Sequence, residues 1–427
     1  MTGIKHLKCL SAVKSMKTIH PLTPAAFPGN HCPMHTALSL GARIKGVSTL
    51  VIGTSECGYY SRNIPISSPY ADESLHWTYI LDSKEVVFGF RDGIIDSIRE
   101  MDAAGAKIIL LLATCVPELI GEDIDSICYE IQPQIKARVL HIPLGNFKCG
   151  SYHSGYWKTL KKLGMVTEKA PIKTKTVNIL GRSVLEDHIP MPEIVSVLKQ
   201  NQVPLRFLSP DSSLEDFISA GDAQMSISLS PFMNPFAEYL KEEHDVPFIS
   251  LHDVYRVKEI NKVYTILEDH LKLNIVPNMK DLEKKADLLQ TQMAVQLNNT
   301  SFIMANIGAL QPLPLSVYFS ELGMSPIMIH MEEYYPSDTK WKESLLTRDE
   351  NPILCLMLNE HADKTIIEEL CPDIVIGDWG GRSQTKPPTL PIMDFYGQVG
   401  YERTISLLSR ITTIQSKSKE ARDHGII

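Results

Sequence analysis

Short apolar runs alternate with longer segments of helical periodicity along almost the whole chain. Most of these runs are continuously apolar rather than alternating, which is typical of parallel strands covered by helices on both faces. The runs that predict strands are 47–53, 107–114, 138–144, 176–181, 224–230, 247–251, 301–308, 325–331, 352–358 and 373–378. Helical patterns such as 89–105 and 281–299 lie between them. The alternation predicts an α/β fold with three stacked Rossmann-like domains and mostly parallel sheets.

Two breaks in this pattern suggest where the domains divide. The segment 168–176 is polar and contains a proline, and a new strand follows it directly. A long helical stretch, 253–299, is likewise followed by a new strand. We therefore expect domains at 1–170, 171–295 and 296–427, and a frayed polar tail over the last residues.

Composition and charge narrow the possible partners and the compartment. The 427 residues carry a formal net charge of −8, which argues against nucleic acid, because phosphates require a basic face. No apolar run reaches the roughly 18–20 residues that a membrane helix needs, and the N-terminus lacks the features of a signal peptide. We expect a cytoplasmic protein without a membrane or nucleic-acid partner. The eight cysteines are too few for a disulfide scaffold, and none forms a C-x-x-C pair.

Three cysteines occupy the same kind of position, at a junction between predicted elements. Cys115 ends the run 107–114 just before a proline, Cys57 follows the run 47–53, and Cys32 directly precedes a proline and a helical segment. Because the carboxyl ends of parallel strands meet at one edge of a sheet, we expect these thiols to converge there. A helix N-terminus favours an anion, so we also expect lowered thiol pKa values and thiolates able to bind iron or zinc.

A plainer interpretation applies to every cysteine, because a buried cysteine is more often a small core residue than a ligand. Cys128 and Cys355 lie in apolar patterns and are predicted to be core residues, and the same is favoured for Cys371. Cys9 lies in a predicted tail, and Cys149 in a loop. For the three junction cysteines the pattern alone leaves both interpretations open.

Three thiols do not complete an iron–sulfur site, since such clusters usually take four protein ligands. The missing ligand could be His31, His35, a serine, or a residue from another polypeptide of the same assembly.

The spacing C-x24-C-x57-C and the residues around it resemble nitrogenase component 1 and its relatives. The matching stretches are Gly53–Cys57, Val87–Gly89, which marks a helix start in that family, and Thr114–Asp123. The resemblance is closer to the β-type subunit, because 147–157 is similar to a stretch in which that subunit carries a serine beside its cluster. By this match, Ser151 occupies the serine position. The similarity continues more weakly through the second and third domains.

The resemblance implies a specific role for the chain. Family members pair two homologous subunits, each of which gives three cysteines to an iron–sulfur cluster at their interface, either an [8Fe-7S] P-cluster or a [4Fe-4S] cluster. Carried over, Cys32, Cys57 and Cys115 bind the metal and Ser151 lies beside it. The partner is a homologous α-like subunit, in a heterodimer or heterotetramer, or a second copy of this chain. A separate ATP-dependent iron protein supplies electrons, in keeping with the absence of a G-x-x-x-x-G-K-[ST] motif here.

Two departures from the α-type subunit qualify that role. The stretch 225–236 has no thiol where α-type chains hold the catalytic cofactor, and Asp394 and Tyr396 stand near the position of their histidine ligand. Both fit a β-like subunit of a nitrogenase-like two-component reductase that relays electrons, with no catalytic residue assigned to this chain. One alternative is a cofactor-assembly scaffold that binds a cluster without turnover. Another is an α/β binding protein with core cysteines. Tyr156 and Trp157, with His153, are candidates for lining a cavity near the cluster.

Overall fold

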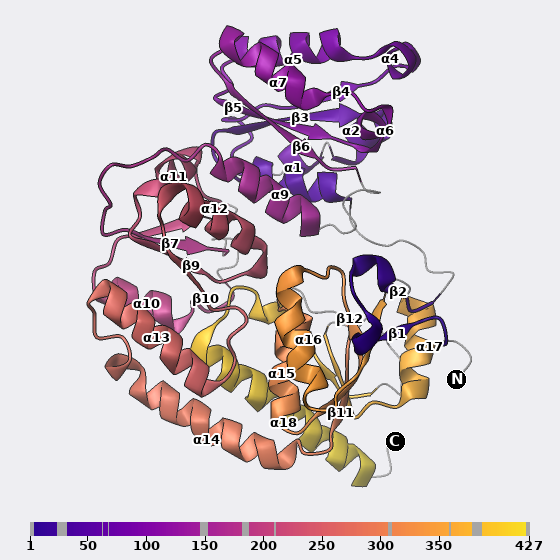
Figure 1. Cartoon of the computed structure of the whole chain (residues 1–427), viewed down its shortest axis with the longest axis vertical. Coiled ribbons are helices and arrows are strands. Elements are labelled where there is room, and N and C mark those ends of the chain that lie inside the picture. Colours follow the sequence, from indigo (N-terminus) through magenta and orange to yellow (C-terminus); the bar gives the residue numbers. More distant parts are fainter. Residues whose placement is uncertain are drawn as a thin grey trace.

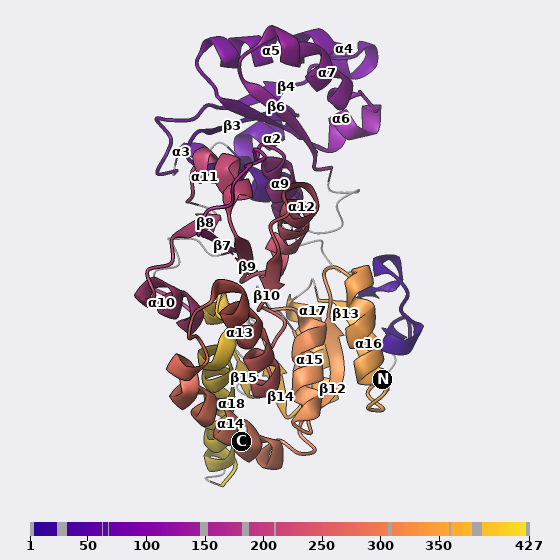
Figure 2. The same cartoon turned by 60° about the vertical axis from the view of Figure 1, so that its left-hand side comes forward.

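Three mainly parallel sheets, each covered by helices, follow one another through the molecule (Figure 1, Figure 2). The predicted fold class is therefore confirmed. The computed structural model describes residues 4–23, 32–61, 63–66, 68–145, 153–181, 188–208, 211–305, 310–357, 360–377 and 387–423.

The first sheet has four parallel strands in the order β4-β3-β5-β6. Their bounds are β3 Val47–Gly53, β4 His76–Ile80, β5 Ile108–Ala113 and β6 Arg138–Pro143. Its helices are α1 Pro33–Ala42, α2 Ser55–Ser61, α3 Asn63–Ile66, α4 Ser83–Phe88, α5 Arg91–Ala103, α6 Cys115–Ile120, α7 Ile124–Ile131 and α9 His153–Gly164. Alternate residues of β3 and β5 face a core beneath α1 and α9 or a second core beneath α5 and α7. Burial on both faces explains why these runs are continuously apolar.

The second sheet also has four parallel strands, in the order β10-β9-β7-β8. The strands are β7 Val177–Leu180, β8 Leu205–Leu208, β9 Met225–Ser228 and β10 Phe248–Ser250. The helices are α10 Glu193–Gln200, α11 Leu214–Ser219, α12 Asn234–His244 and α13 Val257–Leu271. Helix α9 packs against both α1 and α12, so the first two sheets share one hydrophobic core.

The third sheet is the largest and includes the beginning of the chain. Its order is β1-β13-β12-β11-β14-β15, with β2 also paired to β13. The strands are β1 Lys8–Cys9, β2 His20–Pro21, β11 Ser301–Met304, β12 Ser325–His330, β13 Ile353–Leu356, β14 Ile374–Ile376 and β15 Thr389–Leu390. The helices are α14 Lys280–Gln296, α15 Pro312–Glu321, α16 Thr339–Leu346, α17 Glu360–Leu370 and α18 Gly400–Asp423.

The prediction of a tail around Cys9 is wrong. Cys9 lies in β1, which pairs antiparallel with β13, and Leu10 and Val13 are fully buried just beyond it. Lys342 donates a hydrogen bond of 2.6 Å to the carbonyl of Val13. The N-terminal segment therefore belongs to the third sheet, although in sequence it comes directly before the first. The domain boundaries at 170 and 295 stay a prediction.

Helix α18 connects the second and third sheets through buried polar contacts. Arg403 is fully buried and donates to the carbonyl of His252 at 2.7 Å, and Thr404 donates to the carbonyl of Tyr255 at 2.8 Å. At the start of α18, the buried Glu193 carboxylate accepts hydrogen bonds from the backbone of Tyr401 and from the Tyr264 hydroxyl. Buried hydrogen bonds of this kind hold packed elements in one arrangement. No helix within the described ranges has the length and apolar character needed to cross a lipid bilayer.

Candidate functional site

Cys57 and Cys115 follow neighbouring parallel strands at the same edge of the first sheet. Ile52 of β3 is paired with Ala113 of β5, and the Thr114 amide donates to the Ile52 carbonyl at 3.1 Å. A Cβ added to Gly53 would lie 2.4 Å from Thr114 Oγ1 and 3.2 Å from Cys57 Sγ. Glycine is therefore required at this strand end, because any side chain would displace the residues that surround the thiol.

Cys32 reaches the same edge from a different part of the chain. It is the N-cap residue of α1, with Pro33 as the first helical residue, and both Cys32 and Cys57 pack against the core beneath α1 and α9. Burial raises the pKa of the Cys32 thiol, and the charges of Cys115 and Cys57 raise it further. The charges of Cys57 and Cys115 therefore act on Cys32 at this edge, and the convergence of all three thiols on one metal site stays a prediction.

The expected lowering of the thiol pKa is wrong for Cys32. The backbone N–H groups of Met34 and His35, at the start of α1, do favour the thiolate, but burial outweighs them. Desolvation penalises the charged form, and two neighbouring thiolates add repulsion of like charges. A cation bound among the three sulfurs would reverse both effects, because it replaces the protons with a compensating charge.

The other described cysteines are placed differently. Cys355 is fully buried in the core of the third sheet, as predicted, and burial strongly raises the pKa of its thiol. Cys128 is partly buried against the core beneath α5 and α7, and burial raises its pKa to about 12. The core prediction for Cys371 is wrong, because this residue is exposed at the end of α17. Cys32, Cys57 and Cys115 are all partly buried, so their sulfurs are not sealed inside the core.

The donor set suits a cluster better than a single ion. Within the described ranges, no group of three or more His, Cys, Asp or Glu side chains is close enough to hold one metal ion. In an iron–sulfur cluster, each thiolate binds a different iron, so the sulfurs do not need to meet at one point. His31, Cys149 and Ser151 lie outside the described residues.

Exposed apolar side chains surround this edge. Helices α2, α4 and α6 follow β3, β4 and β5, and they lie together at one end of the sheet (Figure 1). Phe88 of α4 is 86% exposed, Val87 of α4 and Leu119 of α6 are each 71% exposed, and Tyr59 of α2 is 59% exposed. We call these four residues the apolar rim. Exposed apolar groups on one part of a surface are common where proteins contact one another.

One local expectation from the resemblance is wrong. The stretch Val87–Gly89 was expected to mark a helix start, but it ends helix α4 instead. Gly89 follows the helix with a positive φ, a conformation that glycine adopts readily and that stops the helix there.

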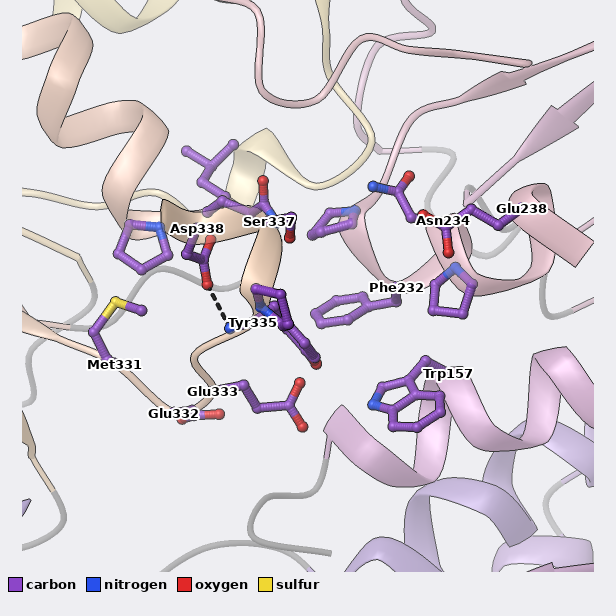
Figure 3. Close-up of a pocket in the computed structure, with 16 residues that line it drawn as sticks. Trp157, Phe232, Asn234, Glu238, Met331, Glu332, Glu333, Tyr335, Ser337 and Asp338 are labelled. Carbon is purple, nitrogen blue, oxygen red and sulfur yellow. Dashed lines mark hydrogen bonds between the residues drawn. The ribbon is translucent and has the colours of Figure 1, made fainter. Parts of the chain in front are cut away.

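A second feature lies where the three sheets meet, at a cavity of about 410 Å³. Trp157 of α9 lines it together with Phe232 and Tyr335. Tyr156 is not among its lining residues, and none of the three edge cysteines lines it, so the sequence-based expectation of a cavity near the cluster stays a prediction. The cavity wall also carries the carboxylates of Glu238, Glu332, Glu333 and Asp338 (Figure 3). Sequence reasoning missed these acids, because they come from segments with no motif and about 100 residues apart.

Comparisons with known proteins identify the family of the chain. The profile of the family described as nitrogenase component 1 type oxidoreductase matches residues 32–415. The chain belongs to this family. The matched region begins at Cys32 and includes the other two edge cysteines.

Individual family members extend the comparison. The chain is 24% identical over 345 residues to the nitrogenase iron-molybdenum cofactor biosynthesis protein NifE of Clostridium pasteurianum, covering 77% of this chain and 73% of that protein. It is 23% identical over 190 residues to a chain of the light-independent protochlorophyllide reductase of Picosynechococcus sp., covering 40% and 37%. The solved structure titled "Nitrogenase Cp1 at pH 6.5" superposes with a TM-score of 0.70 at 17% identity, over 92% of this chain and 93% of that chain. The relatives thus include both a cofactor-biosynthesis protein and a component of a reductase.

Proposed function

We propose that this family member is the β-like subunit of a nitrogenase-like two-component reductase. In this proposal, Cys32, Cys57 and Cys115 hold an iron–sulfur cluster at the interface with a homologous subunit, and Ser151 lies beside it. The observation that supports the proposal is that Cys57 and Cys115 follow neighbouring parallel strands at one sheet edge, and that the charges of both act on the partly buried Cys32. When bound, the cluster supplies electron transfer between a separate ATP-dependent iron protein and a substrate site in the partner.

The chain's own residues would prepare the site in two ways. The N–H groups of Met34 and His35 favour the thiolate form of Cys32, which is the form that binds iron. Gly53 leaves the space in which Cys57 and Thr114 approach each other. A reducing compartment such as the cytoplasm would keep the thiols available.

The apolar rim supports the part of the proposal that concerns a partner. Three thiols leave a cluster short of ligands, and the exposed side chains around them offer a surface for the chain that supplies the rest. This partner is a homologous α-like chain or a second copy of this one.

The test is anaerobic purification of the full chain with its co-purifying partner, followed by iron and sulfide analysis and EPR. We expect at least about two irons per chain, the share of a four-iron cluster divided between two chains. Cys57→Ala should lose the iron and its absorbance, whereas Cys371→Ala, which changes an exposed thiol far from the edge, should keep both. Iron-free protein, or a Cys57→Ala variant with unchanged iron, would rule the cluster out.

A cofactor-assembly scaffold is the second candidate, favoured by the similarity to NifE. Against it, the residues described as lining the cavity include no cysteine or histidine, the usual ligands for a transferred cluster. The two candidates differ in turnover. A complex that consumes substrate when given its reductase and ATP is an enzyme, and one that only releases a cluster to another protein is a scaffold.

A further inference from the structure

The cavity at the junction of the three sheets is formed by loops and helix starts that follow the carboxyl ends of parallel strands. Phe232 and Glu238 follow β9, the segment Glu332–Asp338 follows β12, and Trp157 comes from α9. Ligands of open α/β sheets bind at this edge of the strands. The volume of about 410 Å³ falls within the usual range for a small-molecule site.

The charge of the wall limits what can bind. Four carboxylates line the cavity, and no lysine, arginine or histidine is among its described lining residues. Burial raises the pKa of Asp338 to about 7, Lys340 acts in the opposite direction, and the charge of Glu333 raises it again. An anionic ligand would meet the same repulsion, whereas a cation would relieve it.

Hydrogen bonds hold two of the acidic groups, Glu333 and Asp338, in place before any ligand arrives. Ser154 Oγ donates to Glu333 Oε1 at 2.9 Å, and this hydrogen bond joins helix α9 to the loop after β12. The Tyr335 amide donates to Asp338 Oδ2 at 2.8 Å. Figure 3 shows the Glu333 carboxylate pointing toward the Trp157 ring, with Phe232 and Tyr335 beside it. A wall fixed in this way reduces the entropy lost on binding.

The aromatic side chains supply the apolar part of the site. Ring faces attract cations as well as apolar groups, and tryptophan does so most strongly. The Phe232 ring packs against Tyr156, with centroids 5.7 Å apart. The indole nitrogen of Trp157 is buried and has no hydrogen-bond partner among the described residues, so it can donate to a ligand oxygen. Lys158 lies 5.9 Å from the same ring but does not line the cavity.

A metal ion does not fit the same wall. No group of three or more carboxylate, imidazole or thiol side chains within the described ranges converges on one point. The four carboxylates instead share the wall with the aromatic rings of Trp157, Phe232 and Tyr335. This arrangement suits a cation whose charge is carried on an organic skeleton.

We propose that this cavity binds an organic ammonium ion, with its charge between Glu333 and Asp338 and its apolar part against Trp157, Phe232 and Tyr335. The site is separate from the cysteine edge, and the inference does not depend on the proposed function. A ligand with a hydroxyl or carbonyl oxygen near its charge would also accept a hydrogen bond from the Trp157 indole N–H.

The test is calorimetric titration of the purified full chain with choline, 2-phenylethylammonium and spermidine. The uncharged 3,3-dimethylbutan-1-ol and 2-phenylethanol serve as matched shapes without the charge. We expect saturable binding of at least one ammonium probe and about tenfold weaker binding of its neutral counterpart. Glu333→Gln keeps the shape of the wall and should weaken the binding of the ammonium ion by a similar factor. Glu242→Gln is the control. Glu242 is exposed on α12, one turn beyond the cavity residue Glu238, so this substitution should leave the binding of every probe unchanged.

Three results would overturn the proposal. One is that none of the three ammonium probes binds saturably up to about 50 mM, since specific pockets bind small ligands at least in the millimolar range. Another is that the neutral analogue binds as tightly as its ammonium partner. The third is stoichiometric competition by Mg²⁺ or Ca²⁺, which would identify an inorganic cation site instead. Circular dichroism of Glu333→Gln separates lost binding from lost folding.

Discussion

The cysteine edge of the first sheet and the acidic cavity between the sheets occupy the same kind of position, at the carboxyl ends of parallel strands. They differ in completeness. The cysteine edge presents three thiols and an exposed apolar rim, and in our proposal a metal and a partner complete it. The cavity has walls from all three sheets, and two of its four acidic groups already accept hydrogen bonds from within the chain. On these two proposals, one polypeptide combines a site that assembly completes with a site that folding completes.

Removing one edge thiol should separate the two sites most clearly. Cys115→Ser should reduce the iron of the anaerobically assembled complex to near background, because a hydroxyl is a poor substitute for a thiolate on iron. Ammonium binding in the cavity should stay within about twofold of the parent, since distant sites act independently. Iron analysis and calorimetry on the same preparation provide the measurement. Loss of both properties would show that the two sites are not independent.

A substitution at Gly155 should damage both sites together. A Cβ at this position would lie 2.2 Å from the Pro33 carbonyl oxygen, beside Cys32, and the same helix carries Trp157 into the cavity. Gly155→Ala should therefore lower the free energy of unfolding by about 1–3 kcal/mol through overpacking, despite the better helix propensity of alanine. Denaturant unfolding measures the change. Lys161→Ala, exposed on the same helix, is the control, and equal stability of both variants would contradict the close contact.

A charge on the apolar rim should affect the assembled site alone. Phe88→Asp changes a side chain that is 86% exposed, so the unfolding free energy of the isolated chain should move by less than about 0.5 kcal/mol. Association with the partner should weaken by about tenfold or more if the rim is buried there. Analytical ultracentrifugation or quantitative co-purification measures this. Unchanged association would place the partner on another surface.

The smallest expected effect is a pH dependence of the unfolding free energy, caused by Asp338 in the wall of the cavity. Burial raises the pKa of Asp338 to about 7, whereas an unfolded aspartate titrates near about 4, so the folded chain holds the extra proton between these values. The free energy of unfolding should therefore fall as the pH rises from about 4 to about 7. Asp338→Asn should remove this part of the dependence and raise stability at pH 8 relative to the parent, on the order of 1 kcal/mol.

The measurement is denaturant unfolding of parent and variant at pH 5 and pH 8. Glu343→Gln, an exposed acid on α16 outside the cavity, is the control and should follow the parent at both values. A variant that loses stability equally at both pH values would show that Asp338 acts through its hydrogen bond to Tyr335 rather than through its charge.

Local sequence pattern predicted the longer apolar strands and missed those of mixed composition. All ten predicted runs contain strands; most are buried on both faces, although β6 and β10 lie at sheet edges. Strands β4 and β8, also at sheet edges, were missed because their composition is mixed, so no continuous apolar run marks them. The two-residue strands β1 and β2 were missed because pairing with β13, more than 300 residues away, makes them strands at all.

The sequence by itself determined that the chain is a layered α/β protein and that three thiols stand at the ends of its elements. That was possible because hydrophobic periodicity and junction residues are local properties of the chain. The tertiary structure decided that Cys32 is buried enough for its pKa to rise, and that Trp157, Glu333 and Asp338 share one cavity. Burial and the effect of neighbouring charges depend on which distant segments pack together. The spacing of residues within one segment carries no information about that packing.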